Sequence, residues 1–174
     1  TKLGESFTIW SSNQMPHNAR RVLSGLLEVP QHAVRVIAPD MGGGFGVKIY
    51  VYPEEYLVAH LARLLHRPVR WIGDRREDLL ASYQAREQSH DLEVAARSGG
   101  MIRGVRNRYT VDMGAYSPWG LVVPFNAAST RRGSCRVANY LVEMQAVDTN
   151  QSPMAPYRAA GRPKRVFAHV FPFS

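Results

Sequence analysis

Four glycines crowd into residues 41–48, whose sequence is MGGGFGVK. Glycine is used where the backbone needs a positive φ or must come very close to another group, and consecutive glycines cost conformational entropy on folding. Without Cβ atoms, the amides of Gly42, Gly43, Gly44 and Gly46 can face a bound oxygen or phosphate, while the ring of Phe45 closes one side. The run predicts a ligand-binding loop, and a glycine-rich turn without a ligand is the alternative.

Spacing excludes two common nucleotide-binding loops. The phosphate loop of nucleoside triphosphatases needs glycine directly before lysine, but Val47 separates Gly46 from Lys48. Ile49 then stands where that loop needs a hydroxyl side chain. The dinucleotide fingerprint, counted from Gly42, needs a third glycine where Val47 stands. Neither a nucleoside triphosphate nor a nicotinamide dinucleotide is therefore the expected ligand.

Hydrophobic periodicity predicts strands and helices on both sides of the loop. The expected strands are 7–10, 33–38, 69–72, 91–95, 103–111 and 140–147, and the expected helices are 19–28 and 53–65. Asn18 is the expected cap of the first helix, Pro53 opens the second, and the turn at 98–100 predicts a hairpin. The fold class is therefore α+β, with mixed sheets and packed helices. No repeat or linker divides the sequence, so a single domain over residues 1–174 is expected.

Both expected helices are amphipathic, which predicts the side chains that they bury. The first is expected to bury Val22, Leu23, Leu26 and Leu27. The second is expected to bury Leu57, Val58, Leu61, Leu64 and Leu65. The paired acids Glu54 and Glu55 suit the positive end of the second helix dipole.

The chain is basic, with a formal net charge of +8. Such a charge favours anionic partners, including nucleic acid. However, nearly all the cations are arginines, they are spread along the chain, and carboxylates stand among them. This mixture is more typical of a salt-bridged surface or a subunit interface than of a nucleic-acid stripe.

Cysteine usage and hydropathy predict a soluble protein of a reducing compartment. Cys135 is the only cysteine, which excludes an internal disulfide framework and a cysteine metal site. The apolar stretches are shorter than the ~18 residues of a membrane span, and residues 1–10 do not read as a signal segment. A cytoplasmic location is therefore expected, with no transmembrane segment.

Five blocks in a fixed order carry a family resemblance. They are WSSNQMPH, VRVIAPDMGGGFGVK, HRPVRWIGDRREDLLAS, VDMGAY and TNQSPMAPYRAAGRP, and they extend from residue 10 to residue 163. With them the sequence resembles the molybdenum-binding large subunit of the xanthine dehydrogenase and aldehyde oxidase family. Within that family, it most resembles the bacterial carbon monoxide dehydrogenase-like large chains. The resemblance implies a fragment, a partial molybdopterin-binding domain from the first half of the family's molybdenum-binding region.

The resemblance also implies roles for particular residues. The loop backbone at Gly43, Gly44, Phe45 and Gly46 is expected to pack against the metal centre and its pterin. Gln14 falls where the family places an amide that hydrogen-bonds an oxo group, and Arg158 matches the arginine that helps to hold the cofactor. The cofactor is therefore expected to be molybdopterin, with its cytosine dinucleotide form as one option. No catalytic residue and no metal ligand is assigned within the chain.

The family's reaction implies partners and a range of substrates. Such enzymes oxidise a small molecule with water-derived oxygen, and their electrons leave through iron–sulfur clusters to a flavin. This sequence has neither a cluster-binding cysteine set nor a flavin motif, so an iron–sulfur subunit and an FAD subunit are expected as partners. Ala159 stands where carbon monoxide-oxidising members carry cysteine, and Ile49 where purine-oxidising members carry glutamate. Aldehydes or aromatic carbon acids are therefore the expected substrates.

The end of the sequence departs from the family. The family follows GRP with an acid, where this sequence has Lys164, and the tail from about residue 164 diverges. The family's general base lies beyond the region matched here. The expected function is a partial large subunit that is inactive alone.

A function of another class remains open. The charge, together with Trp10, Trp71 and Trp119, also fits a basic non-catalytic module that binds nucleic acid or an acidic partner subunit. The family resemblance itself implies no nucleic-acid partner.

Overall fold

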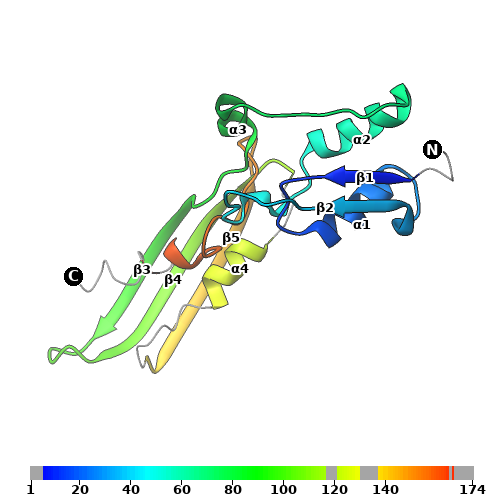
Figure 1. Ribbon diagram of the computed structural model, residues 1–174. Helices are drawn as coiled ribbons and strands as arrows, with labels where there is room; N and C mark the ends of the chain where they lie inside the picture. Colours follow the sequence, from blue (N-terminus) through cyan, green and yellow to red (C-terminus); the bar gives the residue numbers. More distant parts are fainter. Residues whose placement is uncertain (1–5, 117–120, 130–136, 165, 167–174) are drawn as a thin grey trace. The chain divides into compact units, whose positions relative to one another are not determined.

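A two-stranded parallel sheet leads into the glycine loop (Figure 1). Strand β1 (Phe7–Trp10) pairs with β2 (Val34–Ile37), and helix α1 (Pro16–Leu26) connects them, as a parallel pair requires. The computed structural model describes residues 6–116, 121–129, 137–164 and 166. The chain divides into two compact units, 1–82 and 83–174, and each is described here by itself. A single domain over the whole chain stays a prediction.

The core of the first unit lies between α1 and the parallel sheet. Leu23 and Leu27 are buried there with Ile9 and Val34, which confirms two of the leucines predicted to face inward. Leu26 is 52% exposed, so its predicted burial is wrong. The helix begins at Pro16 rather than Ala19, because proline fits the first helical turn, where no N–H partner is needed.

Helix α2 (Pro53–Leu65) has the predicted bounds but turns a different face inward. Ala59 is buried, Tyr56 packs against the same cluster, and the Arg63 guanidinium lies 5.0 Å from the ring centre of Phe7. Positions 56, 59 and 63 share a helical face, and the small side chain at 59 allows close packing. The predicted burial of the leucines is wrong: all four remain at least 39% exposed, namely Leu57, Leu61, Leu64 and Leu65.

The predicted strand over 69–72 is absent, and a short helix follows instead. Trp71 and Ile72 are exposed and no described strand pairs with them, so apolar character alone did not make a strand. Asp74 caps helix α3 (Arg75–Ala81): its side chain accepts from the Glu77 backbone N–H, and its backbone N–H donates to the Glu77 carboxylate. This capping box was a sequence signal that the strand prediction overlooked.

The second unit is built on a mixed three-stranded sheet, as Figure 1 shows. Strands β3 (Gln88–Ala96) and β4 (Ile102–Gly114) form the predicted antiparallel hairpin, and β5 (Asn139–Asp148) pairs in parallel with β4. The α+β class with mixed sheets is thus confirmed. Helix α4 (Val122–Ser129), which the sequence did not predict, packs on one face of this sheet.

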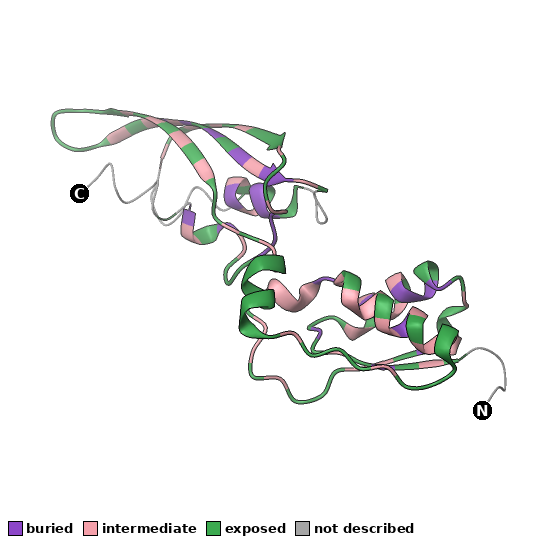
Figure 2. Ribbon diagram, turned by 90° about the horizontal axis from the view of Figure 1, so that it is seen from above, coloured by how far each residue is buried: buried purple, intermediate pink, exposed green. Residues whose placement is uncertain are grey.

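Burial alternates along β4, as Figure 2 shows. Tyr109, Val111 and Met113 face the core with Val123 and Met154. The hydroxyl of Tyr109 donates to the carbonyl of Pro124 at 2.8 Å. This bond satisfies a buried polar group and ties α4 to the sheet.

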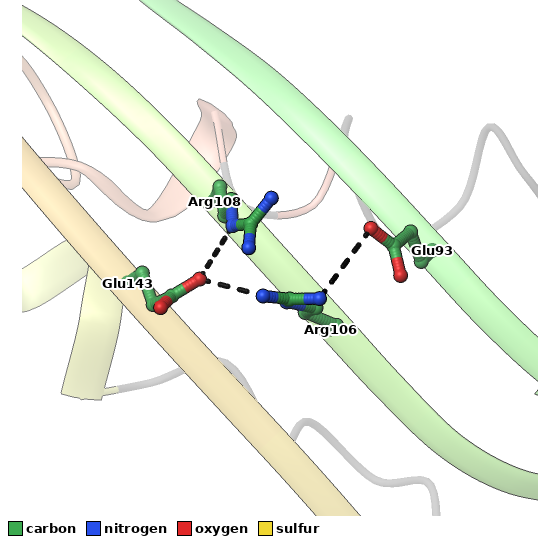
Figure 3. Close-up of polar contacts among 4 residues, drawn as sticks. All are labelled: Glu93, Arg106, Arg108 and Glu143. Atoms are coloured by element: carbon green, nitrogen blue, oxygen red, sulfur yellow. Dashed lines mark hydrogen bonds and ion pairs between the residues drawn. The ribbon is translucent and has the colours of Figure 1, made fainter.

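The opposite face of the sheet carries paired charges (Figure 3). Arg108 Nε lies 2.6 Å from Glu143 Oε2, and Arg106 lies 3.5 Å from the same oxygen and 3.9 Å from Glu93. Arginines mixed with carboxylates here form the salt-bridged surface that the sequence favoured. Exposed pairs of this kind contribute little to stability.

Some predictions fall on residues outside the described ranges. They are those for Cys135 and Trp119 and, apart from residue 166, those for the tail after Lys164. No helix in the described part of the chain is both long and apolar enough to cross a membrane.

Candidate functional site

The glycine loop uses backbone conformations that suit its sequence. Gly43 and Gly46 have φ of 132° and 96°, and Phe45 between them has φ of 52°. Positive φ is costly for residues with a Cβ, so the two glycines are required by geometry. The ring of Phe45 is 53% exposed and folds back over Gly43, where a Cβ would lie 2.7 Å from the ring.

Gln14 lies directly against this loop. A Cβ built on Gly44 would be 2.5 Å from Cδ and Oε1 of Gln14, a distance that real side chains do not reach. The Gly46 backbone N–H donates to Gln14 Oε1 at 2.9 Å, and the Gln14 backbone N–H donates to the Lys48 carbonyl at 2.7 Å. The structure therefore brings Gln14, Gly44 and Gly46 together, although their binding role stays a prediction.

The amide of Gln14 has one group still available. Its carbonyl oxygen accepts from Gly46, and its side chain is exposed. An amide nitrogen carries two donors. The NH2 group can therefore donate to an oxygen placed beside the loop.

Asn13, the residue before Gln14, is held in place by its own side-chain hydrogen bonds. Its side chain is 2% exposed, donates to the Tyr50 carbonyl at 2.7 Å and accepts from the Met15 backbone N–H at 2.7 Å. Its amide joins the segment before α1 to the segment before α2, a role that needs both a donor and an acceptor.

Glu55 is a second residue whose role sequence reasoning missed. Ser11 Oγ donates to Glu55 Oε1, and the Tyr52 backbone N–H donates to Glu55 Oε2 at 2.9 Å. Burial raises the pKa of Glu55, and the hydrogen bonds from Ser11, Tyr52 and Asn13 oppose that rise. A glutamate three residues after a helix cap was the available signal, because it reaches back in a capping box.

Arg158 belongs to the second unit, in a turn with strained backbone. Ala159, Ala160 and Gly161 all have positive φ, at 75°, 37° and 99°. The Arg86 guanidinium donates to the Arg158 carbonyl at 3.3 Å and lies 5.2 Å from the ring centre of Tyr157. The structure thus shows how the backbone of Arg158 is held, while its predicted meeting with the loop stays a prediction.

Lys164, which follows this turn, is a buried cation. It is 8% exposed, and its Nζ has no hydrogen-bond acceptor among the described residues. Burial, and then repulsion from Arg86, lower the pKa of Lys164 to about 8. The sequence singled out position 164 only as a departure from an expected acid.

A pocket lies in the second unit. It has a volume of about 770 Å³, lies at one end of the three-stranded sheet and is lined by Glu93, Arg106, Asn139, Tyr140 and neighbouring residues. None of the predicted site residues lines it. Within the described ranges, no group of three or more His, Cys, Asp or Glu side chains could hold a metal ion.

Comparisons with known proteins agree on one family. The family described as "Molybdopterin cofactor-binding domain" matches residues 2–169. The nicotine 6-hydroxylase large subunit of Paenarthrobacter nicotinovorans is 41% identical over 88% of the chain and 19% of that subunit. The carbon monoxide dehydrogenase large chain of Hydrogenophaga pseudoflava is 36% identical over 84% of the chain and 18% of its own length.

A solved structure shows the same fold. Quinoline 2-oxidoreductase from Pseudomonas putida 86 matches with a TM-score of 0.85 and 37% identity, over 90% of this chain and 20% of that one. The chain thus spans about a fifth of the length of each of these three proteins.

Proposed function

The chain belongs to the molybdopterin cofactor-binding domain family of molybdenum hydroxylase and carbon monoxide dehydrogenase large subunits, and from this premise we propose that its glycine loop forms one wall of a molybdopterin site. The observation that carries the proposal is the approach of Gln14 to Gly44, which any Cβ at position 44 would prevent. The residues fit the group, because a pterin with a phosphate and polar ring edges binds amide donors and guanidinium groups. When bound, the cofactor supplies the two-electron redox chemistry.

Each residue has a separate part in this proposal. The NH2 group of Gln14 donates to an oxygen of the cofactor, and the backbone of Gly43, Gly44 and Gly46 lies along it. Phe45 shields one side with its exposed ring. Arg158 contributes its guanidinium from a turn whose carbonyl is held by Arg86.

The substrate is proposed from the departures in sequence and from the names of relatives. Ala159 and Ile49 argue against carbon monoxide and purines, which leaves aldehydes and aromatic carbon acids. The names nicotine 6-hydroxylase and quinoline 2-oxidoreductase favour an aromatic nitrogen heterocycle within that range. The reaction would replace a ring C–H bond by C–OH with oxygen from water, and the two electrons released would pass to the iron–sulfur and FAD groups of the partner subunits.

The rest of the proposal concerns the whole enzyme. Because the matched region is about a fifth of each large subunit named above, we propose that turnover needs the remaining large-subunit residues and that this chain is inactive alone. Iron–sulfur and FAD groups would come from partner subunits in the cytoplasm. The cytosine dinucleotide form of the cofactor is part of the same proposal.

The basic-module alternative gains no support from the described residues. Arg106 and Arg108 on the sheet are paired with Glu143 rather than gathered in a cationic stripe. The relatives named above are all oxidoreductase or hydroxylase components.

A binding titration tests the cofactor proposal. We expect the purified chain to bind molybdopterin released from a donor enzyme weakly but saturably, measured by the change in pterin fluorescence. No turnover of nicotine, quinoline or an aldehyde is expected. The absence of saturable binding would contradict the cofactor site, and turnover by the chain alone would contradict its inactivity.

Gly44→Ala should weaken this binding, with Gly42→Ala as the matched control. The new methyl group at position 44 would push away the Gln14 side chain, because that flexible group can move and the loop backbone cannot. Losing one amide hydrogen bond is expected to raise the dissociation constant by about tenfold. A Cβ at Gly42 meets nothing within 4 Å, so Gly42→Ala should bind as the unchanged chain does. Equal affinities for the two variants would show that Gln14 does not contact the cofactor.

A further inference from the structure

One carboxylate reaches both chain segments that meet at the hydrogen bond between Gly46 and Gln14. On one side, Ser11 Oγ donates to Glu55 Oε1, and Ser11 lies in the segment that runs into Gln14. On the other side, the Tyr52 backbone N–H donates to Glu55 Oε2 at 2.9 Å. The Tyr52 hydroxyl then donates at 2.9 Å to the carbonyl of Val47, the neighbour of Gly46.

A helix-dipole role does not explain this arrangement. Glu54 and Glu55 both lie in the first turn of α2, and an exposed acid serves the dipole without losing its hydration. Burial of Glu55 raises its pKa, so keeping the carboxylate ionised there costs free energy. A half-buried carboxylate that accepts a hydrogen bond from each of the two segments fits a geometric role better.

Neighbouring hydrogen bonds join the same two segments. Asn13 Nδ2 donates to the Tyr50 carbonyl at 2.7 Å, which joins the same two segments two residues away. The Gln14 backbone N–H donates to the Lys48 carbonyl at 2.7 Å. Between Ser11 and Glu55, the two segments are therefore joined at several successive points, and Glu55 is the only carboxylate among the residues that make these bonds.

We propose that Glu55 is a positioning residue that sets the distance between Gln14 and the glycine loop by binding Ser11 and Tyr52 at once. The functional interpretation of this arrangement rests on the proposed cofactor site. The hydrogen bonds themselves are present in the chain without cofactor, where their effect can be measured.

The test compares Glu55→Gln with Glu54→Gln by NMR of the 15N-labelled, cofactor-free chain. Both variants remove one carboxylate from the first turn of α2, so an effect through the dipole would be equal in the two. Positioning predicts that Glu55→Gln alone shifts the Gly46 backbone amide and the Gln14 side-chain NH2 signals, with Gly46 exchange faster by roughly fivefold. Equal shifts in the two variants, or unchanged signals in Glu55→Gln, would overturn the proposal.

Ser11→Ala and Tyr52→Phe test the two sides separately and guard against a variant that does not fold. Each removes one hydroxyl while leaving Glu55 in place. Both are expected to shift the Gly46 amide signal, because a fixed distance needs both ends of the link. A shift with Tyr52→Phe alone would show that Glu55 does not transmit the position of the Gln14 segment, and the proposal would fail.

These measurements are independent of cofactor binding. If the unchanged chain binds no molybdopterin but the shifts appear as expected, the proposed function fails and the positioning role stands. If binding is saturable but the shifts are absent, the reverse holds.

Discussion

Adding one methyl group at Gly114 will destabilise the second unit strongly. Gly114 has φ of 65°, and a Cβ there would collide with the Ser152 carbonyl and lie 2.9 Å from Pro153 Cα. The left-handed backbone alone costs an alanine about 1–2 kcal/mol. The clash adds to this cost because the atoms that it meets are backbone and cannot rotate away.

Gly114→Ala is also expected to displace the segment that leads to Arg158. Residues 151–155 are held by hydrogen bonds to the end of β4 and to Gln84, including Met154 N–H to the Met113 carbonyl at 2.9 Å and Ala155 N–H to the Gln84 carbonyl at 2.8 Å. Gly114→Ala would push this segment away from β4, and with it the turn that carries Arg158.

Urea unfolding of Gly114→Ala and Gly104→Ala measures the effect. Gly104 lies in the same strand, but its nearest atom to a built Cβ is the Asn139 carbonyl oxygen at 3.5 Å, an ordinary contact. The free energy of unfolding should therefore fall far more for Gly114→Ala. Similar values for the two variants would mean that Ser152 does not lie against β4.

Removing the buried charge of Lys164 will stabilise the protein. The pKa of Lys164 is lowered to about 8 from 10.5, by burial first and by Arg86 second. Each pKa unit corresponds to about 1.4 kcal/mol, so ionised Lys164 costs about 3 kcal/mol at pH 7. Lys164→Met should raise the free energy of unfolding by about that amount.

The pH dependence provides a second measurement. Between pH 8 and about 10.5, the unfolded chain keeps the Lys164 proton and the folded chain has released it, so stability rises with pH. Lys164→Met lacks this contribution, and its advantage over the unchanged chain should shrink across that window. A constant difference from pH 7 to pH 10.5 would contradict a buried ammonium group that lacks an acceptor among the described residues. Lys48→Met, at a half-buried lysine in the loop, is the control and should change stability by less than about 0.5 kcal/mol.

Local chemistry made the glycine loop and α2 predictable. The glycines of the loop indicated a backbone with positive φ, because they lack Cβ atoms. Pro53, followed by two acids, indicated a helix start, and α2 begins at that residue. Alternation likewise predicted the β3–β4 hairpin, whose turn signal lies between the strands. In each case the deciding interactions lie within a few residues.

Long-range packing accounts for the failures. Leu57 and Leu64 looked buried because α2 is amphipathic, but the face in contact with the core is set by Tyr56 and Ala59. The strand over 69–72 failed for want of a neighbouring strand, which no local pattern can supply. The contacts of Asn13 with Tyr50 and of Glu55 with Ser11 were missed for the same reason, since these partners lie 37 and 44 residues away.

The hydrogen bond from the Gly46 N–H to Gln14 Oε1 fixes the orientation of the Gln14 side-chain amide. A free amide can rotate by half a turn and exchange its oxygen for its nitrogen at little cost. Here that rotation would set the NH2 group against the Gly46 N–H, leaving two donors face to face. The outward end is therefore held as a donor, so it discriminates in favour of an unprotonated oxygen over a hydroxyl that must itself donate.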